Sequence, residues 1–284
     1  MAIAKFGWLV SYPKSGNTWL RMMLISLMSG GKPVDINHSN NFDLNVNVCS
    51  HGELDEMFGI ESSELTAFEI AALRPALHKA IAAHYDQGLI LRKVHDRFWH
   101  TASGLAAFPA ELTRGAVYLV RDPRDVVVSY AHHRGLGLDD IIDFMADADA
   151  ILAVSTDRFK EQLPQPLGSW SSHAASWLGQ HELPVLVIRY EDLLANTEAR
   201  LSDIAIHLGL DVGPQDIEAA VNATRFDVLQ TQEITRGFKE RRIESSAPFF
   251  RQGKAGVWRD YLSAAQVARI ETDHGAMMER FAYF

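Results

Sequence analysis

A lysine lies in a short loop near the start of the chain, in the segment SYPKSGNTW at residues 11–19. An apolar run at residues 6–10 precedes this loop, and a longer apolar run at residues 19–28 follows it. This order predicts a buried strand, a tight loop and a packed helix. Loop amides and a helix N-terminus direct positive charge to one point, and Lys14 adds a full charge there. The segment therefore predicts an anion-binding cradle.

Other side chains able to do chemistry stand at the ends of other apolar runs. His95 ends one such run, Arg121 directly follows a second, and Tyr190 ends a third. These runs alternate with helical patterns along the chain, which is typical of a doubly wound parallel sheet. Because ligands of such sheets bind at the carboxyl ends of the strands, we expect all three side chains to meet Lys14 in one site.

The elements that must position these side chains follow from the same patterns. The expected strands cover residues 6–10, 88–95, 116–120 and 184–190, and the expected helices cover 19–28, 65–84, a stretch from Asp125, 141–153, 169–180 and 263–280. We predict a three-layer α/β fold, in which helices flank a central parallel sheet like that of phosphate-loop proteins. Since no repeat or linker divides the chain, residues 1–284 are expected to form one domain. Irregular excursions are expected near residues 30–62 and 134–168.

Composition narrows the function. The chain has 284 residues, of which 47% are hydrophobic and 22% charged, as is ordinary for a globular protein. Its formal net charge of −9 argues against a general nucleic-acid binder. The single Cys49 excludes an intrachain disulfide and a zinc site built on several cysteines. No apolar run approaches the ~18 residues of a membrane span, and no secretory signal pattern is present, so the expected location is the cytoplasm.

The spacing around Lys14 bears on the kind of anion. The loop of nucleotide triphosphatases reads Gly, four residues, then Gly-Lys-Ser/Thr, whereas here Lys14 precedes Gly16. The third expected strand is followed by Arg121, where a metal-binding carboxylate would suit Mg²⁺ better. Ser129 lies eight residues further on, near the face of the next helix. We therefore predict a site for two anionic groups that needs no metal ion.

These features resemble those of the sulfotransferases that use 3′-phosphoadenosine-5′-phosphosulfate (PAPS), the cytosolic type and its bacterial members in particular. SYPKSGNTW resembles the family's 5′-phosphosulfate loop, and YLVRDPRDVVVSYAHH at 118–133 resembles its 3′-phosphate stretch. FFRQGKAGVW at 249–258 resembles the family's C-terminal nucleotide-binding segment. Shorter matches follow in the family's order at residues 93–95, 190–192 and 224–226. The ordered set covers nearly the whole chain.

The resemblance implies transfer of a sulfuryl group from PAPS to a hydroxyl or amine of a small molecule, which leaves PAP as product. In such an in-line transfer the protein mainly positions the partners and neutralises charge. Lys14 is expected to stabilise charge on the departing phosphate, and Lys93 to contact the same group. His95 is expected to be the general base, because a neutral imidazole can take the acceptor's proton.

The resemblance also implies how the nucleotide is held. The 5′-phosphate is expected on the loop residues Lys14, Ser15, Gly16, Asn17 and Thr18. The 3′-phosphate is expected on Arg121, Ser129, Arg251 and Gly253, and the adenine on Trp19, Tyr190, Thr224 and Phe226.

Three positions depart from the family's pattern. The first is Asn17, where Thr is commoner in the family. Gln252 stands where the family usually has Lys, so one charged contact is lost there or moves to Lys254. Arg225 replaces the usual Ser. The basic stretch at 235–250 is either a solvated loop or a lid over the nucleotide.

Two other functions are weighed against this one. A phosphoryl-transferring kinase on a related sheet is weakened by the missing triphosphate loop and Mg²⁺ carboxylate. A nucleotide-binding module without catalysis is weakened by the complete set Lys14, Lys93, His95 and Ser129.

The acceptor is the part of the function that the sequence leaves open. It is expected near residues 42–51, Phe98, Trp99 and the segment after His133, whose mixed surface suits a partly apolar alcohol, phenol or amine. No nucleic-acid or membrane partner is expected. The oligomeric state is open, with a homodimer among the alternatives.

Overall fold

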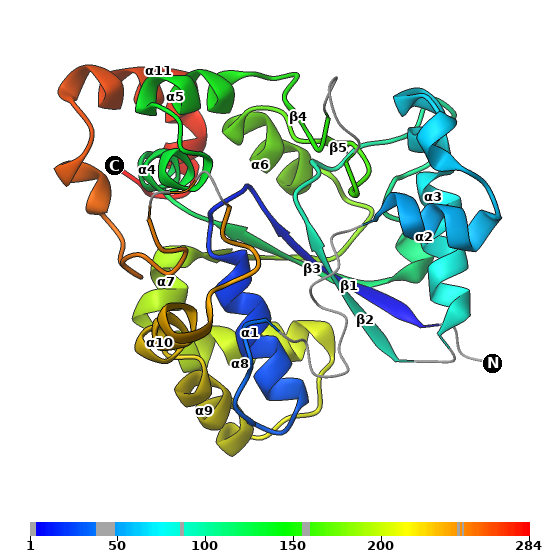
Figure 1. The fold of residues 1–284 in the computed structure, drawn as a ribbon, viewed down its shortest axis with the longest axis horizontal. Helices are drawn as coiled ribbons and strands as arrows, with labels where there is room; N and C mark the ends of the chain where they lie inside the picture. The colour runs from blue at the N-terminus through cyan, green and yellow to red at the C-terminus, as the bar shows by residue number, and fades with distance from the viewer. Residues whose placement is uncertain (1–3, 38–48, 86–87, 155–159, 243–244, 246) are drawn as a thin grey trace.

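A four-stranded sheet forms the centre of the computed structural model, which describes residues 4–37, 49–85, 88–154, 160–242, 245 and 247–284 (Figure 1). Its strands are β1 (Lys5–Ser11), β2 (Leu89–Val94), β3 (Thr113–Val120) and β6 (Val185–Arg189). They lie in the order β2-β1-β3-β6 and are all parallel. The four strands and their parallel arrangement are those that the sequence predicts.

Helices cover both faces of this sheet. Side chains alternate between the two faces along each strand, and apolar side chains point to both, so each face needs a covering layer. Trp8 and Tyr118 pack into one apolar cluster, whereas Leu9 and Val117 pack into the other. The first face is covered by α3 (Ala67–His84), α4 (Pro123–Arg134), α5 (Leu138–Ala146), α6 (Trp170–Gly179) and α11 (Ala264–Arg280). The second is covered by α1 (Asn17–Met28), α8 (Thr197–Leu208), α9 (Pro214–Ala223) and α10 (Phe226–Arg236). The three-layer prediction is confirmed.

Shorter elements connect these layers. They are α2 (His51–Phe58), α7 (Tyr190–Ala195), the 3₁₀ helices η1 (Ser62–Glu64), η2 (Ala110–Leu112) and η3 (Val257–Asp260), and a small antiparallel pair, β4 (Ile151–Leu152) with β5 (Gln165–Pro166).

Three local predictions are corrected. The excursion at 30–62 contains α2, because Ser50 and Glu53 form a capping box that starts a helix at His51. The helix expected at 141–153 ends at Ala146, and residues 151–152 instead pair with β5. The helix expected from Asp125 starts two residues earlier, because the Asp122 side chain accepts from the Arg124 amide and caps α4.

The strand register brings the loops of the predicted site together. Val10 pairs with Val94, and Ser11 pairs with Leu119, so β1, β2 and β3 end at one edge of the sheet. Val120 pairs with Arg189, which adds the end of β6 to the same edge. The segments that carry Lys14, His95, Arg121 and Tyr190 therefore start side by side.

Candidate active site

The loop between β1 and α1 has a backbone that is shaped for an anion. Lys14 and Gly16 lie in the left-handed region, with φ values of 67° and 102°. Gly16 is required there, since a Cβ atom would come within 2.6 Å of the Tyr190 ring. Between them, the buried Ser15 Oγ has no hydrogen-bond partner within the described part of the chain. Such turns present successive amides to one point, and the N-terminus of α1 adds to them.

Asn17 holds this loop onto the end of β1. Its side-chain amide donates to the Leu9 carbonyl at 2.8 Å and to Ser11 Oγ at 3.2 Å. The side chain is therefore committed to the fold, and only the Asn17 backbone amide is placed to serve an anion. The sequence prediction that Asn17 takes part in the cradle is thus narrowed to its backbone.

The position of His95 is set by a hydrogen bond from its ring to β1. His95 Nδ1 lies 2.7 Å from the Ser11 carbonyl oxygen, which can only accept, so Nδ1 carries the proton. Burial, followed by the charge of Lys93, holds the pKa of His95 well below its ordinary value. The ring is therefore neutral at pH 7, and its Nε2 lone pair is available to take a proton.

Two lysines share the end of the sheet with His95. Burial, followed by the charge of Lys93, lowers the pKa of Lys14 to about 7. Burial lowers the pKa of Lys93 to about 8. The Lys14 ammonium also lies 3.7 Å from the centre of the Phe249 ring. Two cations held close together in a buried place are strained toward deprotonation, and an anion placed between them would relieve that strain.

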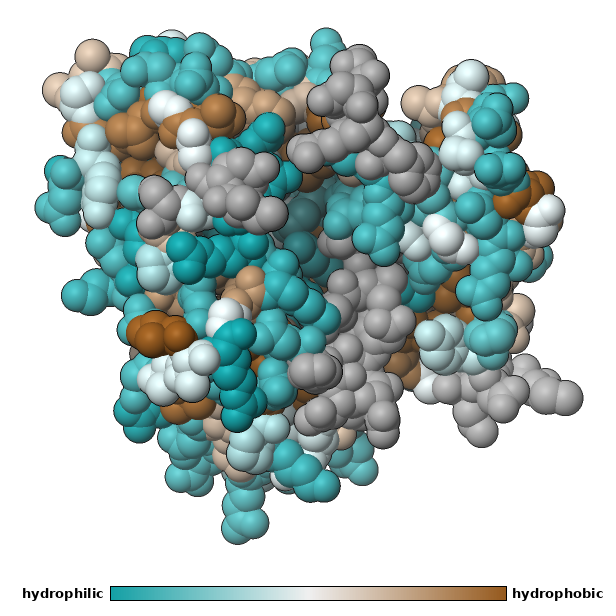
Figure 2. Space-filling view, viewed as in Figure 1, coloured by the Kyte–Doolittle hydropathy of each residue, from teal (hydrophilic) through white to brown (hydrophobic). Residues whose placement is uncertain are grey.

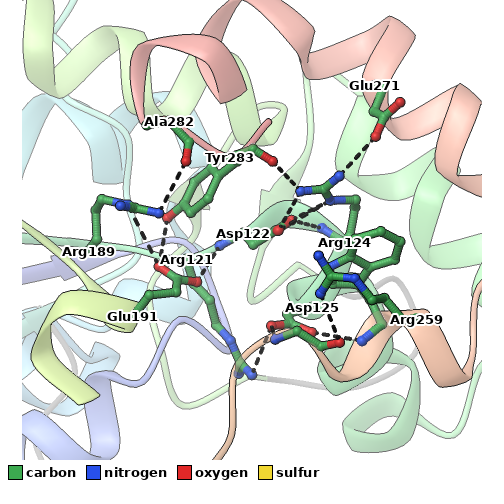
Figure 3. Close-up of polar contacts among 12 residues, drawn as sticks. Arg121, Asp122, Arg124, Asp125, Arg189, Glu191, Arg259, Glu271, Ala282 and Tyr283 are labelled. Carbon is green, nitrogen blue, oxygen red and sulfur yellow. Dashed lines mark hydrogen bonds and ion pairs between the residues drawn. The ribbon is translucent and has the colours of Figure 1, made fainter. Parts of the chain in front are cut away.

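Arg121 forms a second cationic centre at the start of α4 (Figure 3). Its guanidinium donates to the carbonyl oxygens of Lys14 at 3.3 Å and Lys254 at 2.9 Å, and lies 4.4 Å from the centre of the Tyr190 ring. It therefore joins the N-terminal loop to the C-terminal segment. Its buried Nε has no partner among the described residues.

Asp125 fixes the C-terminal segment against Arg121. Its two carboxylate oxygens accept from the backbone amides of Gly256 at 2.7 Å and Trp258 at 2.9 Å. One of them also lies 3.8 Å from an Arg121 nitrogen. Asp125 is fully buried, so these contacts are shielded from water. Asp125 therefore fixes the position of residues 251–258 relative to α4.

The remaining charged groups in Figure 3 anchor this arrangement to the end of the chain. The Arg124 guanidinium binds both carboxylate oxygens of Asp122, and pairs with Glu271 at 2.9 Å. It also donates to the backbone carbonyl of Tyr283. The side-chain hydroxyl group of Tyr283 in turn donates to Glu191. These contacts are structural, because none of the five residues borders the cavity described below.

Aromatic residues from α1, α7 and α10 also contribute to the site. The Trp19 ring lies edge-on to Tyr190 at 6.1 Å, and its Nε1 donates to the Thr224 carbonyl at 3.0 Å. Thr224 is fully buried, so its carbonyl is a fixed acceptor that orients the Trp19 ring. Gly253 packs on Phe226, where an added Cβ atom would lie 2.4 Å from the ring. Only glycine allows this approach of the C-terminal segment.

One cavity of about 790 Å³ brings most of the predicted site residues together. Those that border it are Lys14, Gly16, Asn17, Thr18, Trp19, Lys93, His95, Arg121, Ser129, Tyr190, Phe226, Arg251, Gln252 and Gly253. Ser15 and Thr224 do not border it, since both are fully buried behind it. Figure 2 shows a hollow near the centre of this face whose visible walls are mostly hydrophilic.

The cavity is cationic although the chain is acidic. Nine of its described lining residues are Lys or Arg and two are Glu, whereas the whole chain has 27 basic and 36 acidic residues. The nine are Lys14, Lys93, Arg121, Arg134, Lys160, Lys239, Arg242, Arg251 and Lys254. Such a concentration of one sign in a recess favours an anionic ligand.

Sequence reasoning missed one charged contact at the loop. Glu240 accepts from Thr18 Oγ1 at 3.2 Å and from Arg21 Nη2 at 2.6 Å. Although burial opposes it, the charges of Arg21 and Lys93 lower the pKa of Glu240, so the carboxylate is ionised. The Thr18 hydroxyl is thus engaged, which leaves its backbone amide for an anion. No local pattern marks this pair, because 219 residues separate the two partners.

The surroundings of the cavity change three expectations. Phe98 and Trp99 are not among its lining residues, because Phe98 packs on Trp177 in the core, with their ring centres 5.4 Å apart. Arg225 turns outward to pair with Asp227 at 2.8 Å. Of the basic stretch at 235–250, Lys239, Glu240 and Arg242 border the cavity, as do Phe249 and Phe250.

The contacts described above do not decide the full extent of the acceptor region or the expected absence of a metal ion and of a membrane partner. Residues 42–48 of the expected acceptor region lie outside the described residues. Within the described residues, no group of three or more His, Cys, Asp or Glu could hold a metal ion, and no helix is long and apolar enough to cross a membrane.

Comparison with known proteins places the chain in a family. Sulfotransferase 1B1 of Mus musculus is 22% identical over 274 residues, covering 93% of this chain and 79% of its own length. Cytosolic sulfotransferase 17 of Arabidopsis thaliana is 23% identical over 284 residues, covering 95% of this chain and 72% of its own length.

Solved structures show the same fold. A retinol dehydratase in complex with androsterone and PAP superposes with a TM-score of 0.60 at 19% identity, covering 96% of this chain and 80% of that one. Mouse sulfotransferase SULT7A1 in complex with PAP gives a TM-score of 0.57 at 19% identity, covering 96% and 84%. The model of the sulfotransferase domain matches residues 7–282, which is nearly the whole chain. The chain belongs to the sulfotransferase domain family.

Proposed function

We propose that this protein transfers a sulfuryl group from PAPS to a hydroxyl or amine of a small molecule and releases PAP. The observation that carries the proposal is that two cationic centres, at Lys14 and at Arg121, border one cavity together with a neutral histidine. PAPS has two separate anionic ends, so it matches both centres. Two solved structures with the same fold, those of a retinol dehydratase and of mouse sulfotransferase SULT7A1, are complexes with PAP, which supports the same donor.

The residues present fit the donor. At the loop, the positive-φ turn, whose residues Lys14 and Gly16 border the cavity, suits a 5′-phosphosulfate, and at α4 the unpartnered Arg121 Nε suits a 3′-phosphate. Ser129, Arg251 and Gly253 border the cavity beside Arg121. When bound, PAPS supplies the sulfuryl group and carries away the negative charge as PAP.

His95 then acts as the base on the acceptor. The hydrogen bond from Nδ1 to the Ser11 carbonyl orients the ring, so that Nε2 is the atom that takes the proton. The imidazolium that forms keeps its Nδ1 proton on that carbonyl, which stabilises the charge it gains. Lys14 and Lys93 neutralise charge that develops on the leaving phosphate oxygen, since both line the cavity beside His95.

Calorimetry tests the donor. We expect PAP to bind without Mg²⁺ and ATP to bind weakly with or without it. ATP binding that requires Mg²⁺, together with absent PAP binding, would instead indicate a kinase. PAP binding without any sulfuryl transfer to a broad acceptor panel would indicate the module without catalysis. Neither alternative is favoured by a contact in the described residues.

Asp125→Asn is expected to weaken PAP binding at least about tenfold. The amide would present its N–H to the backbone N–H of Gly256 or Trp258, so one buried donor would lose its acceptor. The segment with Arg251 and Gly253 would then shift from Arg121. Calorimetry with PAP and with 5′-AMP measures this effect, because AMP lacks the 3′-phosphate.

The comparison with AMP separates a loss of 3′-phosphate binding by the displaced segment from a general loss of protein stability. The variant should lose the advantage of PAP over AMP while AMP affinity changes little. Asp260→Asn, at the exposed end of η3 just after this segment, is the matched control and should behave as the wild type. Equal losses for both nucleotides would show that Asp125 acts only on overall stability.

PAP binding is expected to take up protons near pH 7.5. The free protein has a Lys14 pKa of about 7 and a Lys93 pKa of about 8, and the bound anion raises both. Since the complex binds more protons, PAP affinity should fall as the pH rises from about 7 to 9. Titrations in two buffers of different ionisation enthalpy measure the uptake. Lys14→Arg, which stays charged, should reduce it, and unchanged uptake would contradict the assignment.

A further inference from the structure

Part of the cavity lies beyond the residues proposed for the donor. It is bordered by the C-terminal turn of α4, with Tyr130, His133 and Arg134, and by the segments around β4 and β5. Because this part borders the same cavity as His95, the proposed base, and lies outside the residues proposed for the donor, this part is the place for the acceptor if the proposed function holds. Its lining therefore reports on the acceptor's chemistry.

Three cations of this part have no acidic partner. They are Arg134, Lys160 and Arg242, and none of them forms an ion pair with an acid of the described residues. The two lining acids do not neutralise them. Glu161 is exposed at the rim, and Glu240 is committed to Arg21 at 2.6 Å. Lysines and arginines that face a recess without counterions favour a ligand that brings negative charge.

Arg134 is held in place for such a ligand. Its guanidinium carbon lies 5.6 Å from the centre of the Tyr130 ring and 5.4 Å from that of Phe144. Contact with the two rings and a side-chain hydrogen bond to Tyr130 restrict the side chain, and the guanidinium has further N–H donors for a ligand. Burial and the cations Lys14, Arg242 and Lys93 lower the pKa of His133 to about 3, so this neighbour adds no charge of its own.

Two amides complete this wall. Gln165 is 2% exposed, borders the cavity and donates from Nε2 to Gln162 Oε1 at 2.9 Å. The segment that joins the two glutamines is held in place by Arg74, which donates to the Pro164 carbonyl at 2.8 Å. One buried and one half-buried amide in fixed positions suit hydroxyl groups, whereas a purely apolar ligand would leave their polar atoms unmatched. The aliphatic residues 151–154 line the outer part.

We infer that the acceptor is a hydroxylated molecule that carries an anionic group, held by Arg134, Lys160 and Arg242 while the hydroxyl group to be sulfated faces His95. This inference rests on the proposed function. It narrows the acceptor class, since the sequence prediction allowed any partly apolar alcohol, phenol or amine. A carboxylate and a phosphate would be recognised by the same cations, so the experiment has one arm for each.

Matched pairs of probes test the inference on the complex with saturating PAP. Methyl β-D-glucuronide is compared with methyl β-D-glucoside for a carboxylate, and glucose 6-phosphate with glucose for a phosphate. Calorimetry should give at least about tenfold tighter binding for the anionic member of at least one pair, as a charged hydrogen bond supplies. The pair in which the anionic member binds more tightly shows whether the anion is a carboxylate or a phosphate.

Variants assign the preference to the named cations. The double variant Lys160→Gln with Arg134→Gln should reduce the preference to within about twofold, and Lys160→Gln alone should reduce it in part without affecting folding. Lys79→Gln, an exposed position on α3, is the matched control. The preference should also shrink as the salt concentration rises.

The failures of the two proposals are distinguishable. Equal affinity within both pairs, preference for the neutral members, or no binding of any probe would overturn the acceptor inference while PAP binding persists. Loss of PAP binding in the wild type would overturn the proposed function itself.

Discussion

His95→Asn is expected to lower sulfuryl transfer by roughly 10²–10⁴-fold, the range for removal of a positioned general base. Asparagine can keep a donor for the Ser11 carbonyl but has no group that takes a proton at neutral pH. PAP affinity should stay close to that of the wild type, because His95 is proposed to act on the acceptor. Transfer is measured as PAP release with an acceptor mixture, and binding by calorimetry.

Two further variants make this result specific. His181→Asn, at an exposed loop position, should transfer at the wild-type rate. His133→Asn tests the other histidine of the cavity, which is also neutral and borders the acceptor part. If His133→Asn abolished transfer and His95→Asn did not, the base would be His133.

Lys14→Met should lower transfer by roughly 10²–10³-fold, as loss of one preorganised group that stabilises a leaving oxygen does. PAP affinity should fall much less, about tenfold, since the loop amides, Arg121 and Arg251 remain. The difference arises because negative charge on the phosphate oxygen grows as the sulfuryl group departs. Single-turnover transfer and calorimetry with PAP measure the two effects separately.

The proton on residue 14 gives this prediction a second test. Lys14→Arg should keep more transfer than Lys14→Met, and its rate should not fall with the Lys14 pKa of about 7 as the pH rises. Lys79→Met serves as the matched control on the surface. Equal falls in transfer and in PAP affinity for Lys14→Met would assign Lys14 to binding alone.

The sheet was predictable because each strand is a short apolar run with turn residues beside it. β3 is an example, since its burial on both faces requires nearly continuous apolar residues. The ends of elements were less predictable. The start of α4 depends on the Asp122 cap, and β4 forms only because β5, thirteen residues later, lies beside it.

The predicted site residues are mostly brought together, because they follow strands that end at one edge. Their individual roles were less accessible. Asn17 turned out to hold the loop onto β1, Thr224 orients Trp19, and the Thr18 hydroxyl binds Glu240. Each of these roles depends on where a side chain points, which a residue's type and spacing do not specify.

By itself the sequence determined the family, the α/β layering and the two cationic segments around Lys14 and Arg121, because these rest on contiguous motifs and on the period of apolar residues. Only the tertiary structure decided what joins them. Asp125 meets Gly256 and Arg21 meets Glu240 across more than 100 residues. Burial and the charge of Lys93 lower the pKa of His95 and keep it neutral, while a carbonyl on another strand fixes which ring nitrogen carries the proton. Long-range contacts and burial are properties of the packed chain, so no local pattern could contain them.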